Sequence, residues 1–144
     1  AKPIRVLVVD DSALMRKVIP QILESDNSIQ VIGTAIDGNF GLKKLEELRP
    51  QVVTLDLEMP GMGGQETLKN VRAMAEYRET PIVMMTGVSD EAEMRRAAES
   101  GANSYTLKPA NAEQFLKTVI ESTNYWLTVH QYPNHRLPQD VCRR

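Results

Sequence analysis

The chain has 144 residues, and its 17 lysines and arginines nearly balance its 19 aspartates and glutamates, which gives a formal net charge of −2 at pH 7. This length predicts one domain, and the weak net charge argues against nucleic acid or an anionic membrane surface as a partner. No apolar run approaches the roughly 20 residues of a membrane-spanning helix, and the first residues lack a signal-peptide pattern. We therefore expect a cytoplasmic protein.

Short apolar runs alternate with segments of helical periodicity along the chain. The apolar runs, which predict strands, are residues 4–9, 29–35, 52–55, 81–85 and 103–107. The helical segments that follow them are residues 12–23, 38–48, 68–74, 90–100 and 111–120. Because parallel strands need right-handed crossovers, this alternation predicts an α/β fold. We expect a doubly wound, five-stranded parallel sheet in the order 2-1-3-4-5 with five helices, which is a flavodoxin-like topology.

Local signals refine these elements. Pro20 lies inside the first predicted helix, where it removes the bond to the carbonyl of Arg16 and predicts a kink. Gly101 is placed to end the fourth helix. From about Tyr125 the periodicity decays into a segment of mixed polarity with two prolines and the only cysteine, Cys142. We therefore divide the chain into a domain, residues 1–124, and a C-terminal tail, residues 125–144.

Polar residues stand where the predicted strands end. Asp10 and Asp11 follow the first strand, Asp56 the third, Thr86 the fourth and Lys108 the fifth. The carboxyl ends of parallel strands meet at one edge of a sheet, so we expect these side chains to converge. Three carboxylates at one place repel each other unless a cation joins them. Oxygen ligands of this kind favour Mg²⁺.

This group of residues is suited to phosphoryl chemistry. Lys108 and a metal ion would neutralise the phosphoryl oxygens, and the Thr86 hydroxyl would donate a hydrogen bond to them. An Asp56 oxygen would then attack phosphorus and form an acyl phosphate. Asp56, Thr86 and Lys108 are thus the predicted catalytic residues.

Residues 4–122 resemble a response-regulator receiver domain of two-component signalling, of the CheY-like kind. The resemblance rests on Asp10-Asp11, on LDLEMPGMGG around Asp56, on Thr86 and on Lys108-Pro109. It implies that Asp11, Asp56 and the backbone carbonyl of Glu58 hold Mg²⁺ directly, and that Asp10 acts partly through water. It also implies a conformational switch in which Thr86 moves toward the phosphoryl group and Tyr105 turns inward.

Two more specific resemblances divide the chain. The segments VDDSALMRKVI, GTAIDG and TLDLEMPGM are similar to receivers of chemotaxis methylesterases, whereas IESTNYWLTVHQYP is similar to stand-alone regulators that follow phytochrome-type histidine kinases. The resemblance implies a sensor histidine kinase or phosphotransfer protein as the donor, and a downstream protein as the target. A homodimer is also implied, through the face of the fourth helix, fifth strand and fifth helix, or through the tail.

The expected function is that of a stand-alone response regulator in signal transduction. It would accept a phosphoryl group on Asp56 with Mg²⁺ and signal by phosphorylation-dependent protein contact, in a two-component system or phosphorelay. We expect the protein not to be an enzyme, apart from catalysing its own phosphorylation and dephosphorylation, because no methylesterase domain is present. Two alternatives stay open. One is a phosphorylation-independent adaptor that dimerises through the tail, and the other is a receiver fragment of a chemotaxis-type regulator.

The residue types at two positions near the expected site favour slow hydrolysis of a phosphoryl group on Asp56. Glu58, two positions after Asp56, can fold over the site or pair with Lys108. Val88, two positions after Thr86, is apolar and cannot orient an attacking water. A phosphohydrolase of the haloacid dehalogenase type is disfavoured, because such enzymes need an aspartate where this chain has Glu58.

Overall fold

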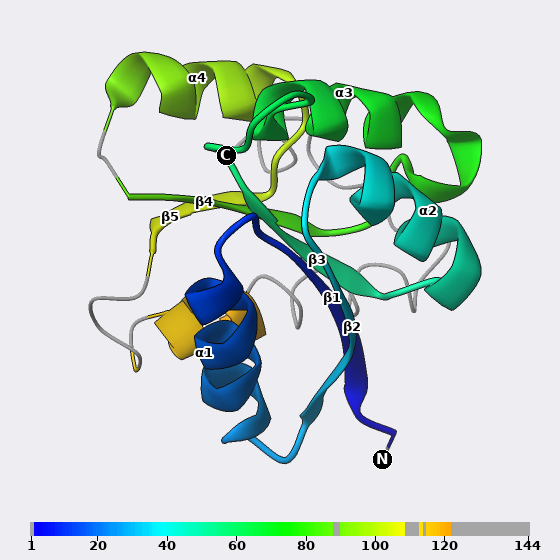
Figure 1. The fold of residues 1–144 in the computed structure, drawn as a ribbon, viewed down its shortest axis with the longest axis vertical. Coiled ribbons are helices and arrows are strands. Elements are labelled where there is room, and N and C mark those ends of the chain that lie inside the picture. The colour runs from blue at the N-terminus through cyan, green and yellow to red at the C-terminus, as the bar shows by residue number, and fades with distance from the viewer. Residues whose placement is uncertain (1, 88–89, 109–112, 114, 122–144) are drawn as a thin grey trace.

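The computed structural model describes residues 2–87, 90–108, 113 and 115–121 (Figure 1). Five parallel strands form one sheet in the order β2-β1-β3-β4-β5, which confirms the predicted topology. Their bounds are β1 Ile4–Val9, β2 Ile29–Ala35, β3 Val52–Asp56, β4 Ile82–Thr86 and β5 Ser104–Leu107. Val8 of β1 pairs with Thr34 of β2 on one side and with Thr54 of β3 on the other, so β1 lies between these two strands.

Helices cover both faces of the sheet. They are α1 (Ala13–Glu24), α2 (Gly38–Leu48), α3 (Gly64–Ala73) and α4 (Glu91–Glu99), with a 3₁₀ turn, η1, at Ala75–Tyr77. Residues 113 and 115–121 are helical as well and belong to the fifth predicted helix. Figure 1 shows α2, α3 and α4 on one face, and α1 with the C-terminal helical residues on the other. The predicted doubly wound α/β architecture is thereby confirmed.

Alternation along the strands produces two cores. Leu7 and Val9 of β1 face the core under α2, α3 and α4, whereas Val6 and Val8 face the core under α1 and the C-terminal helical residues. Residues of β1, β3 and β4 are almost entirely buried, as expected for strands that are covered on both sides. The central strands therefore hold their carboxyl ends firmly in place.

Helix ends follow the chemistry of their flanking residues. Asp37 caps α2 by accepting from the Phe40 N–H at 2.9 Å, and Asp90 caps α4 by accepting from the Ala92 N–H at 2.9 Å. Gly101 follows α4 with φ of +101°, a left-handed conformation that favours glycine. The predicted kink at Pro20 does not interrupt α1, which continues to Glu24.

Arg72, near the end of α3, joins two connections, the one from η1 to β4 and the one from α4 to β5. Its guanidinium donates to the carbonyls of Tyr77, Thr80 and Gly101 at 2.7 to 2.9 Å. It also donates to the side chain of Asn103 at 2.9 Å. Because Gly101 and Asn103 flank the connection from α4 to β5, Arg72 fixes the end of α4 to α3.

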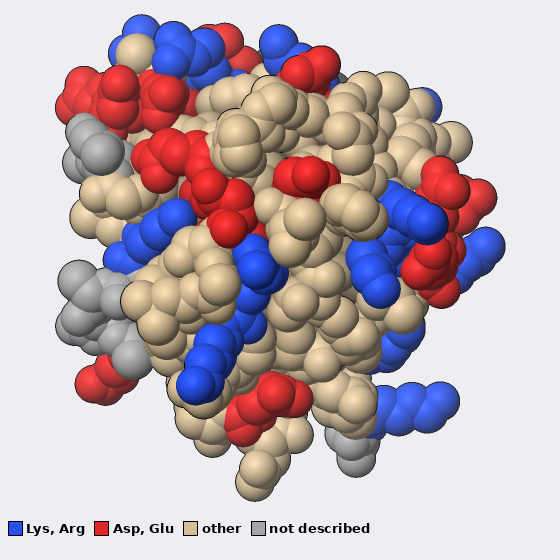
Figure 2. Space-filling model, viewed as in Figure 1, with Lys and Arg blue, Asp and Glu red and all other residues tan. Residues whose placement is uncertain are grey.

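Among the described residues, no helix is long and apolar enough to cross a membrane. On the face drawn in Figure 2, basic and acidic atoms are interspersed, and acidic atoms gather at the upper left, where Figure 1 places α4. Several sequence predictions concern residues that lie outside the described ones. They are Val88, the start of the fifth helix at residues 111–112, and the tail from residue 125 with Cys142.

Candidate functional site

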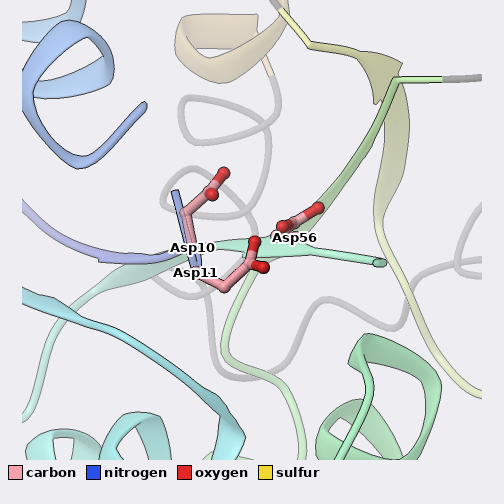
Figure 3. Close-up of side chains that lie close together, drawn as sticks. All are labelled: Asp10, Asp11 and Asp56. Atoms are coloured by element: carbon pink, nitrogen blue, oxygen red, sulfur yellow. The ribbon is translucent and has the colours of Figure 1, made fainter. Parts of the chain in front are cut away.

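Three aspartates converge at the carboxyl edge of the sheet, as predicted. Asp10 and Asp11 follow β1, and Asp56 is the last residue of β3. One carboxylate oxygen from each lies within 4.8 Å of the others, and Figure 3 shows the three side chains grouped at the ends of their strands. Asp10 and Asp56 are completely buried, whereas Asp11 is exposed to solvent. The cluster is therefore anchored inside the protein and open on one side.

Backbone N–H groups orient the two buried carboxylates. Asp10 Oδ1 accepts from the N–H of Ser12 at 2.8 Å, and Ser12 in turn caps α1. Asp56 Oδ1 accepts from the N–H of Glu58 at 3.2 Å. One oxygen of each carboxylate is thus held by the chain itself, which leaves the other oxygen to face its neighbours.

Lys108 bridges the two buried carboxylates. Its Nζ lies 3.1 Å from Asp56 Oδ2 and 3.5 Å from Asp10 Oδ2. The Lys108 N–H donates to the carbonyl of Thr86 at 2.6 Å, so the pairing of β4 with β5 continues to the lysine. The sequence prediction that Lys108 joins the aspartates is consistent with this geometry.

The pKa values reflect this crowding. Burial raises the pKa of Asp56 to about 7, Asp10 and Asp11 act in the same direction, and Lys108 opposes them. Burial alone would lower the pKa of Lys108, but the carboxylates of Asp56, Asp10 and Glu58 outweigh it and raise that pKa. The lysine is therefore firmly charged, while Asp56 gives up its proton reluctantly in the absence of a metal.

The donor set fits Mg²⁺. All three side chains offer oxygen, and one oxygen from each lies within 4.8 Å of the others, near enough for the three to bind one ion. The buried Oδ2 atoms of Asp10 and Asp56 share the single ammonium of Lys108, so the charge of the three carboxylates is only partly neutralised. Exposed Asp11 leaves space for the water ligands that Mg²⁺ retains.

Thr86 and Tyr105 lie on neighbouring strands beside this cluster. Thr86 is completely buried at the end of β4. Tyr105 is paired with Met84, so it shares a face of the sheet with Thr86, two residues further along. Burial raises the pKa of the Tyr105 hydroxyl, the Thr86 side chain lowers it, and the carboxylates of Glu93, Asp90 and Glu58 raise it further.

The Glu58 side chain takes a position that sequence reasoning described only in general terms. We expected it to fold over the site or to pair with Lys108. Its carboxylate accepts hydrogen bonds from the Thr86 hydroxyl and from the N–H of Gly87, the latter at 3.2 Å. Parallel pairing of β3 with β4 brings the residues after Asp56 beside the end of β4. The predicted strand order therefore already indicated that Glu58 lies near Thr86.

Curated relatives match most of this chain but only a small part of their own. A protein of Koribacter versatilis named "Protein-glutamate methylesterase/protein-glutamine glutaminase 2" is 53% identical over 109 residues, which are 74% of this chain and 29% of that protein. A methylesterase/glutaminase of Symbiobacterium thermophilum is 50% identical over 113 residues, 77% of this chain and 30% of that protein.

These names contradict the expectation that no enzyme is involved. The similar proteins are named as enzymes, so the classification as a non-enzyme, which relied on the lack of a methylesterase domain, is wrong. The physical reason is that the residues of one domain carry no signal of another. The match covers less than a third of each relative.

A solved structure and a family model agree on what this domain is. The response regulator domain of Thermotoga maritima CheB is 35% identical, with a TM-score of 0.77, and the alignment covers 89% of this chain and 98% of that one. The model of the family "Response regulator receiver domain" matches residues 6–120. The chain therefore belongs to the response regulator receiver family.

Proposed function

We propose that this receiver domain accepts a phosphoryl group on Asp56 from a histidine kinase or phosphotransfer protein and transmits the signal by protein contact. The observation that supports it most is the position of Asp56. The carboxylate is buried at the end of β3, 3.1 Å from a lysine ammonium and beside two further aspartates. Buried carboxylates with charged neighbours are typical of functional sites.

Each residue of the group has a distinct part in the proposed reaction. An oxygen of Asp56 attacks phosphorus, the bond from phosphorus to the donor's nitrogen or oxygen breaks, and that atom leaves with its electron pair. Lys108, already at the carboxylate, is placed to pair with a phosphoryl oxygen. Thr86 supplies a hydroxyl donor once it turns toward the phosphoryl group.

Asp10, Asp11 and Asp56, with the backbone carbonyl of Glu58, are the residues that would hold Mg²⁺. The ion would supply charge neutralisation for the phosphoryl oxygens and would lower the repulsion among the carboxylates. The clustering of three carboxylates around one lysine ammonium supports this assignment, because one positive charge leaves the group with a net negative charge. Asp10 would contribute partly through a water ligand.

The proposed output is a change at Thr86 and Tyr105 that reaches the face of α4 and β5. This face carries two exposed apolar side chains, Met94 on α4 and Leu107 on β5, 39% and 52% exposed. Such side chains favour contact with another protein. We propose that a downstream target, or a second copy of the chain, binds here, and that neither nucleic acid nor membrane is a partner.

The first test is intact mass spectrometry after incubation with acetyl phosphate and Mg²⁺. We expect a single labile adduct of one phosphoryl group in the wild type and no adduct in Asp56→Asn. A matched control is Glu66→Gln, which removes a negative charge from an exposed residue of α3 and should leave the adduct unchanged. Adduct formation in Asp56→Asn, or none in the folded wild type, would contradict the proposal.

The relatives favour a second candidate, that this domain controls a chemotaxis-type methylesterase. Identities of 53% and 50% with proteins of that name support it. The test combines this chain with the remaining region of the Koribacter relative and measures methanol release from a glutamate-methylated protein. Faster release with phosphorylated than with unphosphorylated chain would support control of an enzyme, and equal release would count against it.

Size measurement distinguishes the remaining alternative, an adaptor that works without phosphorylation. A dimer of equal stability in wild type and Asp56→Asn, with and without acetyl phosphate, would support the adaptor. A dimer that forms only after phosphorylation would support the phosphoryl switch. Light scattering during gel filtration gives both answers in one experiment.

A further inference from the structure

The end of β4 offers two hydrogen-bond donors at the edge of the site, and both point to the same carboxylate. The Thr86 hydroxyl donates to Glu58 Oε1, and the Gly87 N–H donates to Glu58 Oε2 at 3.2 Å. Thr86 is completely buried, whereas Glu58 is exposed. The two oxygens of Glu58 thus each accept from a different donor, as they would if the β4 end were a small anion-binding site.

The fold directs Glu58 to this place. The Glu58 N–H donates to Asp56 Oδ1 at 3.2 Å, and the Leu57 N–H donates to the carbonyl of Met85 at 2.7 Å. The Leu57 bond continues the pairing of β3 with β4 beyond the strand, and the Glu58 bond fixes the turn that follows, so the Glu58 side chain reaches Thr86. Because the Glu58 backbone is fixed, rotation about the side-chain bonds of Glu58 is enough to bring its carboxylate to the two donors or to remove it from them.

A phosphoryl group on Asp56 would compete for the same donors. It carries three strong acceptor oxygens and about two negative charges. A hydroxyl has one proton to donate, so Thr86 cannot serve the phosphoryl group and the Glu58 carboxylate together. The phosphoryl group and the Glu58 carboxylate are both negatively charged and would repel each other when they approach the same donors.

We propose that Glu58 is an internal anion, which holds the Thr86 hydroxyl and the Gly87 N–H in the unphosphorylated protein and must leave them when Asp56 is phosphorylated. This inference rests on the proposed phosphorylation of Asp56. It makes Glu58 an autoinhibitory residue: its departure is a cost of phosphorylation and at the same time releases the Thr86 hydroxyl proton for the phosphoryl group.

The test measures the rate of adduct formation from acetyl phosphate in the wild type, Glu58→Gln, Glu58→Ala and the charge control Glu66→Gln. Removal of the carboxylate is expected to raise the rate about threefold to tenfold, since hydrogen bonds from neutral groups to an exposed carboxylate are of modest strength. Glu58→Gln retains an acceptor for Thr86 and should fall between the wild type and Glu58→Ala. Glu66→Gln should match the wild type.

Two further readouts separate this mechanism from a structural effect. Salt should accelerate the wild type more than Glu58→Ala, because it screens the repulsion between Glu58 and the incoming phosphoryl group. In unphosphorylated protein, the amide proton resonance of Gly87 should move upfield in Glu58→Ala, as its carboxylate acceptor is lost. Circular dichroism checks that each variant is folded.

The outcomes distinguish this inference from the function on which it rests. Adducts that form at equal rates in the wild type, Glu58→Ala and Glu66→Gln would overturn the role of Glu58 and leave phosphorylation of Asp56 intact. Faster formation in Glu58→Ala than in the wild type would support it. If no folded variant forms an adduct, the proposed function fails, and the role of Glu58 fails with it.

Discussion

Replacing Asp56 with asparagine is expected to stabilise the protein when no divalent metal is present. Burial raises the pKa of Asp56 from 3.8 to about 7, and neighbouring Asp10 adds to this effect. The ionised carboxylate is therefore less favourable in the folded chain than in the unfolded chain. Asparagine has a similar shape and can still accept from the Glu58 N–H through its carbonyl oxygen, but it carries no charge.

The size of the effect follows from the pKa difference. About three pKa units correspond to about 4 kcal/mol of folding free energy. The opposing attraction of Lys108 is already contained in this pKa difference. Since the folded-state pKa is the higher one, the wild type is penalised progressively as pH rises from about 4 to about 7. Above pH 7 the penalty is constant.

The measurement is urea unfolding of the wild type and Asp56→Asn in EDTA at pH 5 and pH 8. The variant should be more stable at both, and its advantage should be about 2 kcal/mol larger at pH 8. Mg²⁺ should narrow the gap by binding the carboxylates of the folded wild type. An Asp56→Asn protein that is less stable at pH 8 in EDTA, or an advantage independent of pH, would refute the reasoning.

Three other predictions concern packing and the lifetime of the adduct. Arg72→Met should lower the unfolding free energy by about 3 kcal/mol in urea titration, because four partly buried acceptors lose their donor; a loss under 1 kcal/mol would contradict this. Gly64→Ala should be clearly less stable than Gly63→Ala, since a Cβ at 64 would meet the Asp56 carbonyl oxygen at 2.4 Å and one at 63 meets nothing nearer than 3.8 Å. The phosphoryl adduct should persist for minutes or longer by intact mass with Mg²⁺ present, and a half-life of seconds would count against the argument from Glu58 and Val88.

The sequence predicted the sheet and the acidic cluster well because both follow from strong local signals. Apolar runs that end on aspartate, as at Val9 and Leu55, locate strand ends within a residue, and the topology of a parallel sheet then brings those ends together. The difference at β3, which includes Asp56 itself, arises because the Leu57 N–H still pairs with the carbonyl of Met85.

Contacts between distant loops were not predictable in the same way. The bonds of Arg72 to the loops after η1 and α4 depend on how α3 packs, and an arginine in a helix is ordinarily read as a solvent-exposed charge. The partners of Glu58 depend on a side-chain conformation that spacing does not specify. The expectation about enzymes was wrong for a different reason, since the sequence of one domain is silent about others.

The contacts of α4 suggest how a change at Asp56 would reach the proposed binding face. The N-terminal part of α4 is tied to α3 by a hydrogen bond from the Gln65 side chain to the carbonyl of Glu93 at 3.1 Å. Its C-terminal end is fixed more strongly by Arg72, through the carbonyl of Gly101. A displacement that begins at Thr86 would therefore move the start of α4 and leave its end in place. We expect α4 to tilt about that end, which would move exposed Met94 relative to β5 and change the surface that a partner contacts.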